Sequence, residues 1–99
     1  MKYIVTVYGT LKGDTEQAGK IHNEIITKLS PISKSMGSVG HQTYLNTQNN
    51  KQFFSVDTWD NLEGIQKLYS DPNMAAEFAK MFEGQPDVTV WSESGWFHY

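Results

Sequence analysis

The chain of 99 residues contains no cysteine. Disulfide bonds, thiolate metal sites and cysteine nucleophiles are therefore excluded, and a reducing compartment is expected. No apolar run approaches the roughly 18 residues that a membrane-spanning helix needs. The N-terminal stretch MKYIVTVYGT has the alternation of a strand and lacks the features of a secretory signal. We therefore expect a cytoplasmic protein that makes no contact with a membrane.

Basic residues are scarce as well. Eight Lys and Arg stand against eleven Asp and Glu, the net charge is −3, and no basic patch or arm is present, so a nucleic acid is not an expected partner. The sequence also lacks a Gly-rich phosphate loop. Its three His are scattered along the chain, although folding could bring His22 and His41 together. We expect neither a metal site nor a cofactor.

Aromatic side chains, by contrast, are abundant and make up 13% of the residues, including three Trp. A chain of this length predicts a single domain over residues 1–99. So many aromatic residues in a small domain indicate either a large buried flat surface or a flat ligand.

Residues 53–82 carry the clearest pattern of secondary structure in the sequence. Phe53–Trp59 is rich in aromatic and β-branched residues and predicts a strand. The pair Asp60-Asn61 offers helix caps, and Asp71-Pro72 suits the start of a further helix. Two short helices are indicated by apolar residues at helical spacing: Leu62, Ile65, Leu68 and Tyr69 in the first, and Ala75, Phe78, Ala79 and Phe82 in the second, which spans Asn73–Phe82.

The rest of the chain supplies a matching set of elements. A helix is expected over about Glu16–Leu29, capped by Asp14 or Thr15 and broken or kinked at Pro31, with a further turn before Gly37 ends it. The remaining predicted elements are strands at Lys2–Gly9, Val39–Thr47 and Asp87–Glu93, a polar hairpin turn at Gln48–Lys51, a loop at Glu83–Pro86 and an aromatic tail at Ser94–Tyr99.

The resulting order is β-α-β-β-α-β, with the second helical region split in two. It predicts an α+β protein of the ferredoxin-like type with an antiparallel four-stranded sheet. The helices can cover one face of that sheet, whereas the strands carry apolar residues on both faces. We therefore expect a homodimer in which the open sheet faces of two copies meet.

The pattern of strand, Trp59-Asp60, short helix, Ser70-Asp71-Pro72 and second helix resembles the antibiotic biosynthesis monooxygenase family of the dimeric α/β-barrel superfamily. The element order is similar over the whole chain, and the motif similarity is confined to residues 53–82. The family includes cofactor-free oxygenases of quinol-type substrates and haem-degrading enzymes. The haem degraders carry a His on the second short helix and an Asn on the first strand. Neither is present at Asn73–Phe82 or Lys2–Gly9, so the resemblance argues against haem degradation.

Three residues are candidates for catalysis. His22 lies on the apolar stripe of its helix, where it is either a general base in the cleft or a hydrogen-bonded core histidine. Asp57 lies in an aromatic-rich strand and needs a partner such as His22, His41 or Tyr44, as an acid/base or as a structural pair. Tyr44 could stabilise an oxyanion or simply pack. In a regular strand His41 and Tyr44 lie on opposite faces, so they would act together only across a bulge.

Four further residues are candidates for substrate binding. Trp59 matches the family's Trp at the junction of strand and helix, and this residue is the one that the resemblance carries over. Trp59, Phe78 and Trp91 could hold a planar ligand, with His41 beside them, or could serve core and interface packing instead.

The resulting hypothesis is a cofactor-independent monooxygenase-like enzyme. A small aromatic or quinol/polyketide-type substrate would bind between helices and sheet, where His22, Asp57 and Tyr44 would deprotonate it for reaction with oxygen. The alternative is a non-catalytic ligand-binding or stress-related homodimer of the same fold. An isomerase or decarboxylase of a small phenolic acid is a third possibility, because fold does not fix function.

Overall fold

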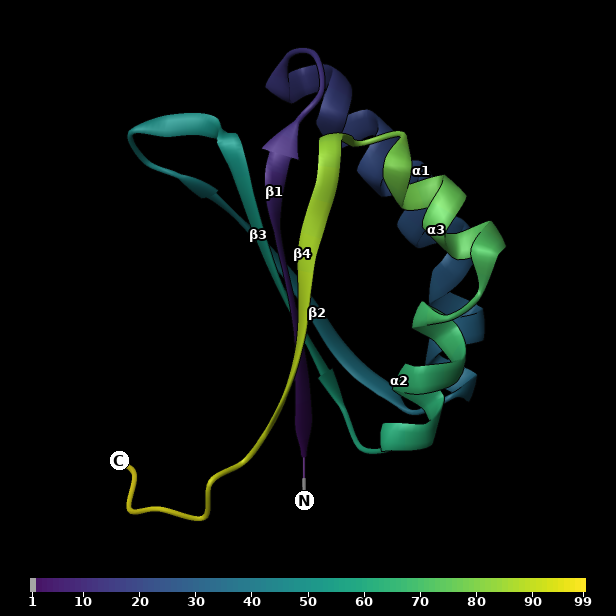
Figure 1. Ribbon diagram of the computed structural model, residues 1–99, viewed down its shortest axis with the longest axis vertical. Coiled ribbons are helices and arrows are strands. Elements are labelled where there is room, and N and C mark those ends of the chain that lie inside the picture. Colours follow the sequence, from purple (N-terminus) through teal and green to yellow (C-terminus); the bar gives the residue numbers. More distant parts are fainter. Residues whose placement is uncertain (1) are drawn as a thin grey trace.

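The computed structural model describes residues 2–99, so Met1, the first residue of the expected domain, lies outside the described part. A four-stranded antiparallel sheet of order β2-β3-β1-β4 carries three helices on one face (Figure 1). This architecture confirms the predicted α+β, ferredoxin-like fold with a split second helical region. The elements are β1 (Tyr3–Leu11), α1 (Thr15–Ser35), β2 (Ser38–Asn46), β3 (Asn49–Trp59), α2 (Leu62–Tyr69), α3 (Pro72–Ala79) and β4 (Phe82–Ser92). Within residues 2–99 no helix has the length and apolar character needed to cross a membrane.

Each helix begins at a side-chain cap. Asp14, Asn61 and Asp71 accept hydrogen bonds from backbone N–H groups two or three residues further on. These bonds satisfy donors that have no partner inside the helix. Asn61 and Asp71 confirm the predicted starts of α2 and α3, and Asp14 rather than Thr15 caps α1.

Pro31 was expected to break or kink the long helix, with a further turn before Gly37. The helix is not broken there, because α1 continues through Pro31 to Ser35, and the further turn is part of it. A proline inside a helix removes one backbone hydrogen bond. The helix is held on both sides of that position, because Leu29 and Met36 pack against the same core cluster.

Two loops were also predicted longer than they are. The hairpin turn consists of Thr47 and Gln48, because Asn46 already pairs with Asn49 and the Asn46 side chain accepts from the Gln48 N–H at 2.8 Å. Residues 49–51 therefore belong to β3 rather than to a turn. Likewise the predicted loop Glu83–Pro86 is part of β4, and α3 ends at Ala79 rather than Phe82.

The start of β4 can contain turn-forming residues for two reasons. The pairing with β1 is irregular between Tyr8 and Thr10, and Gly84 has φ +70°, as expected where a strand bulges. Pro86 is tolerated because β4 is an edge strand, so its missing N–H removes no bond from the middle of the sheet.

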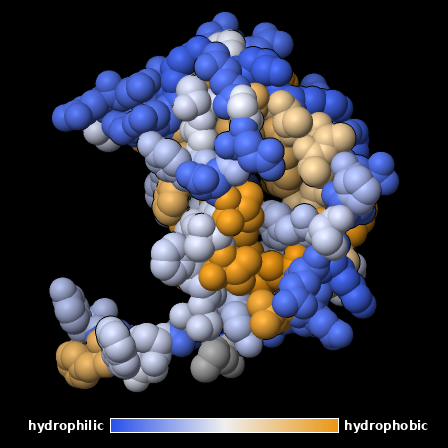
Figure 2. All heavy atoms as spheres, in the orientation of Figure 1, coloured by the Kyte–Doolittle hydropathy of each residue, from blue (hydrophilic) through white to orange (hydrophobic). Residues whose placement is uncertain are grey.

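The core between sheet and helices consists of two clusters. One contains Val7, Leu11, Ala18, Ile25, Phe53, Met81 and Phe82, and the other contains Val5, Trp59, Ile65, Leu68 and Met74. Leu29 and Phe78 pack against both clusters. Figure 2 shows apolar side chains gathered where β4 meets the helical layer.

The opposite face of the sheet is not covered by helices (Figure 1). The strand register places Ile4, Thr6 and Tyr8 of β1 on this face, together with their neighbours on the other strands. Tyr44, Phe54 and Trp91 on this face are 52%, 38% and 55% exposed. Both sheet faces are therefore apolar, as predicted, and one of them has no cover within this chain.

Gly64 provides a test of the contact between α2 and the end of α1. A Cβ added at Gly64 would lie 1.9 Å from the Met36 carbonyl oxygen, whereas one added at Gly19 has no heavy atom within 4 Å. We expect Gly64→Ala to lower the free energy of unfolding by about 1–3 kcal/mol. Gly19→Ala, the same change in open space, should raise it by roughly 0.5–1 kcal/mol. Urea denaturation measures both, and equal effects would contradict the close approach.

Candidate functional site

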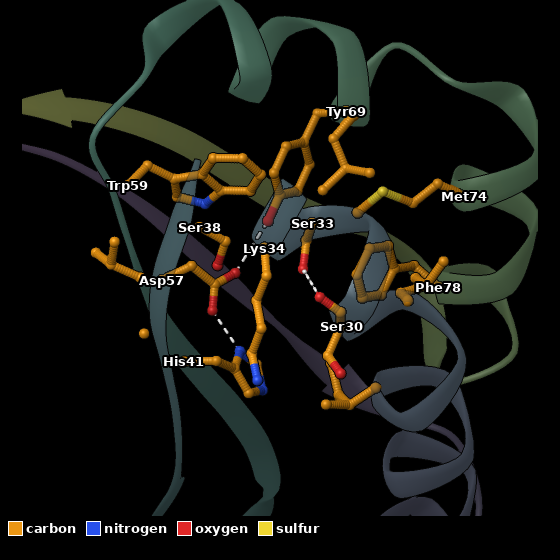
Figure 3. A pocket seen from close by; sticks show the side chains of 15 residues that line it. Ser30, Ser33, Lys34, Ser38, His41, Asp57, Trp59, Tyr69, Met74 and Phe78 are labelled. Carbon is orange, nitrogen blue, oxygen red and sulfur yellow. Dashed lines mark hydrogen bonds and ion pairs between the residues drawn. The ribbon is translucent and has the colours of Figure 1, made fainter. Parts of the chain in front are cut away.

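A cavity of about 110 Å³ lies between the sheet and the helices, beside the core cluster that contains Trp59, Leu68 and Met74. Its lining side chains come from the sheet, from α1 and from the pair α2 and α3, and they point toward a common space (Figure 3). The strands supply His41, Asp57 and Trp59, helix α1 supplies Leu29, Ser33 and Lys34, and α2 and α3 supply Tyr69, Met74 and Phe78. The cavity is thus mostly apolar, with its polar groups on the sheet side and at the end of α1.

Asp57 is the centre of a chain of hydrogen bonds. Its Oδ1 bonds His41 Nδ1, and its Oδ2 accepts from the Tyr69 hydroxyl at 2.9 Å. His41 Nε2 lies 2.9 Å from His22 Nε2, and His22 Nδ1 lies 3.0 Å from Asn23 Oδ1. Both oxygens of a largely buried carboxylate are therefore held, one from the neighbouring strand and one from α2.

Two proton arrangements satisfy this chain. If Asn23 presents its oxygen, His22 donates to it from Nδ1 and must accept at Nε2, so His41 donates from both nitrogens and is an imidazolium paired with the Asp57 carboxylate. If the Asn23 amide is reversed, His22 donates from Nε2 and His41 is neutral. The arrangements differ by one proton and one amide rotation, so the chain can exist in two protonation states without losing a bond.

The surroundings fix the charge of the two outer members. Burial lowers the pKa of His22 below its ordinary value of 6.5, and the neighbouring His41 acts in the same direction, against the opposing effects of Asn23 and Asp57. Burial raises the pKa of the Tyr69 hydroxyl, and the charge of Asp57 and the hydrogen bond to it add to that rise. Tyr69 is therefore a permanent donor, and His22 favours its neutral form.

Trp59 and Lys34 each carry a polar group that lacks a partner among residues 2–99. The Trp59 side chain is 1% exposed, and its indole Nε1 has no hydrogen-bond partner among residues 2–99. An unsatisfied buried donor costs roughly 1–3 kcal/mol. Lys34 is exposed at the cavity and forms no ion pair within the described residues. The cavity is thus lined by a tryptophan whose buried indole N–H is unsatisfied and by a lysine that carries an ammonium group.

The comparisons with known proteins bear on the fold. No protein-family model matches this sequence, and no curated protein is detectably related to it. A mutant of SnoaB, a cofactor-independent oxygenase from Streptomyces nogalater, superposes with a TM-score of 0.74 at 8% identity, over 94% of this chain and 93% of that one. A protein from Nitrosomonas europaea, provisionally named an antibiotic biosynthesis monooxygenase, gives 0.71 at 11% identity over 95% and 91%. Another antibiotic biosynthesis monooxygenase gives 0.67 at 7% identity over 94% and 98%.

This chain has the fold of the antibiotic biosynthesis monooxygenases. At these identities the likeness extends to the fold alone, so the chemistry of the site must be argued from its own residues. On this monooxygenase fold, the cavity lies on the helix-covered face of the sheet, and the carboxylate of Asp57 is its central charged group.

The structure brings most of the predicted site residues together. Asp57, His41, Trp59 and Phe78 line the cavity, and the expected partnership of Asp57 with His41 is present. His22 does not line this cavity and lies one hydrogen bond behind His41. The sequence therefore placed His22 on the correct face of its helix but one hydrogen bond too close to the cavity.

Tyr44 and Trp91 are not part of the cluster within one chain. Tyr44 pairs with Phe54 on the uncovered face, and the regular register keeps it on the side opposite His41. Trp91 lies on that face too, with its Nε1 donating to Thr6 Oγ1 at 2.8 Å. The expected trio of His22, Asp57 and Tyr44 is therefore not assembled, because strand alternation separates Tyr44 from the other two.

Tyr69 and Lys34 line the cavity but were not predicted as site residues from the sequence. Tyr69 was assigned only to an apolar helical stripe, although a buried tyrosine hydroxyl normally requires a hydrogen-bond partner. That requirement, set beside the unpaired carboxylate of Asp57, was the available signal. Lys34 gave no signal, because a lysine near the end of a helix is ordinarily a solvated surface residue and only the fold puts it at the cavity.

The depressed pKa of His22 predicts a pH dependence of stability. Below about pH 6.5 the unfolded chain takes up a proton at His22 that the folded protein resists, so the free energy of unfolding should fall as the pH falls through this range. His22→Gln should lose that part of the slope, as measured by urea denaturation at pH values from about 5 to 7. His98→Gln, in the exposed tail, should keep the full slope. A wild-type slope in His22→Gln would refute the assignment.

Proposed function

We propose that the cavity binds a small electron-rich aromatic molecule of the phenol or hydroquinone class and removes a proton from it, so that the substrate reacts with oxygen without a cofactor. One observation carries this proposal: the Asp57 carboxylate, held by His41 and Tyr69, faces a cavity whose lining is mostly apolar. The shared fold with SnoaB, a cofactor-independent oxygenase, supports the same class of reaction.

Asp57 is the proton acceptor in this proposal. A carboxylate oxygen has more than one lone pair, so each oxygen of Asp57 can still accept a substrate hydroxyl besides its present bond. His41 and Tyr69 fix the orientation of the carboxylate and prevent it from turning away. The proton of the substrate hydroxyl passes to Asp57, and the substrate becomes a phenolate.

Trp59 and Lys34 stabilise the charge that this transfer creates. The indole N–H of Trp59 is a buried donor without a partner among residues 2–99, and the Lys34 ammonium lies at the cavity. Donors already in place where negative charge develops are an effective form of catalysis. The hydroquinone anion, O₂ and the proton that Asp57 returns then yield the hydroxy-substituted quinone and water. One oxygen atom enters the ring, and the substrate supplies the electrons that reduce the other to water.

The role of Asp57 is tested by oxygen consumption with hydroquinone, corrected for uncatalysed oxidation. Asp57→Asn keeps the shape of the side chain but removes the base, and turnover should fall by about 10²–10⁴-fold. Tyr69→Phe removes one hydrogen bond to the carboxylate and should cost roughly tenfold. His98→Gln, whose side chain lies in the tail, is the control. Wild-type turnover in Asp57→Asn would rule out this proposal.

We further propose that the protein is a homodimer formed through the uncovered sheet face. That face presents Tyr8, Tyr44, Phe54 and Trp91 as exposed apolar groups, and monomeric proteins seldom expose a contiguous apolar surface of this kind. The aromatic tail supports the same proposal, since Trp96, Phe97 and Tyr99 are almost fully exposed beyond β4. Face-to-face packing of the sheets of two copies would cover both the uncovered sheet face and the aromatic tail.

Light scattering tests the dimer. We expect twice the chain mass of 11.3 kDa for the wild type at micromolar concentration. Phe54→Asp, which puts a charge on the uncovered face, should give the monomer mass. The control Lys20→Asp, on the exposed surface of α1, should remain dimeric. A wild-type monomer under these conditions would contradict the proposed interface.

A further inference from the structure

A second cavity adjoins the first. It measures about 280 Å³ and lies between α3 and β4, in the apolar region visible in Figure 2. Its own walls are formed by Val7, Ala75, Ala79, Pro86 and Val88, and three further wall residues, Tyr69, Met74 and Phe78, also line the first cavity. Tyr69, Met74 and Phe78 are therefore common walls of the two spaces.

The two cavities differ in chemistry. The first contains the carboxylate of Asp57, the imidazole of His41 and the indole N–H of Trp59. The second has no carboxylate, imidazole or ammonium among its lining residues, which are mostly aliphatic. A ligand that fills both would need a polar head and an apolar extension.

The volumes of the two cavities support a ligand with two parts, a ring and an apolar extension. A cavity of about 150 Å³ in another protein accommodates benzene, so the 110 Å³ of the first cavity is too small for more than a single ring. Pockets for larger organic ligands measure roughly 300–1,000 Å³. The first cavity reaches that range only together with the second.

Phe78 is the side chain that divides them. Its ring is nearly parallel to that of Tyr69, with an interplanar angle of 3° and centroids 6.4 Å apart. Tyr69 is fixed by its hydrogen bond to Asp57, whereas Phe78 has no polar group to anchor it and is only partly buried. Rotation of Phe78 would join the spaces without disturbing the hydrogen-bond chain.

We propose that the protein binds a one-ring phenol or hydroquinone that carries an apolar substituent, with the ring beside Asp57 and the substituent in the cavity between α3 and β4. Phe78 sets the boundary between the two parts. This inference rests on the proposed function and names its substrate class. Each methylene that leaves water for an apolar site strengthens binding by up to about fourfold, so the substituent contributes affinity while the ring undergoes the chemistry.

Resorcinol and hexylresorcinol provide matched probes, because they share the dihydroxy ring and differ only in the alkyl chain. Anaerobic titration calorimetry should show hexylresorcinol binding at least tenfold more tightly than resorcinol. Ala75→Phe fills the second cavity without touching the first and should reduce this gain below threefold, with resorcinol affinity unchanged. Ala76→Phe, the same change one residue further along α3 and outside both cavities, should retain the full gain.

The outcomes separate the two proposals. If the affinity advantage of hexylresorcinol over resorcinol is equal in wild type and Ala75→Phe, the hexyl group binds elsewhere and the inference is overturned. This holds even where Asp57→Asn still weakens the binding of resorcinol. If Asp57→Asn leaves resorcinol binding unchanged, the proposed function fails instead. Phe78→Leu gives an independent check that preserves core packing: a fused-ring phenol such as naphthol should bind this variant more tightly than wild type, and no gain would contradict the role of Phe78 as the boundary.

Discussion

The structure of the site depends on the burial of one carboxylate. The Asp57 side chain is 13% exposed on the helix-covered face of the sheet, and an unpaired charge there would cost several kcal/mol. Its partners come from β2, through His41, and from α2, through Tyr69, and His22 on α1 bonds His41 from behind. One charge can therefore be satisfied only when a neighbouring strand and two helices are all correctly placed, so fold and site are specified together.

The alternation of side chains along the strands separates two kinds of surface. Strand β3 presents Asp57 to the helices, and its neighbouring residues Val56 and Thr58 face the other way. The cavity and the uncovered apolar face thus lie back to back across a single layer of backbone. This division explains why Tyr44 and His41, three residues apart on β2, belong to different surfaces.

The sequence was most informative where a single period governs a whole element. Alternation in β1 and β3 and the helical stripes of α1, α2 and α3 predicted the element order and the covered face correctly, because burial enforces those periods. Boundaries failed where local residue preference was overridden. Pro31 did not end α1, because Leu29 and Met36 hold the helix on either side of it, and Pro86 did not exclude a strand, because β4 lies at the sheet edge.

Contacts between elements were harder to anticipate than the elements themselves. The partnership of His41 with Asp57 follows from direct pairing of β2 with β3, which the hairpin already implied. The Tyr69 hydroxyl reaches the same carboxylate only through the angle at which α2 crosses the sheet, and no periodicity encodes that angle. Lys34 is put at the cavity only by the fold. Site residues on the same strand pair were thus accessible from sequence, and those contributed by the helices were not.

Two energetic irregularities of this small core occur beside one cavity. The Trp59 side chain, with its unsatisfied N–H, and the doubly held Asp57 both line it. Poor packing in general would scatter such features through the core, since each costs stability independently. Neighbouring positions are closely packed: a Cβ at Gly64 would lie 1.9 Å from a backbone oxygen, and Ile65 and Val5 are almost completely buried. Stability lost beside a cavity, while neighbouring positions remain closely packed, is what a binding site produces when its ligand supplies the missing contacts.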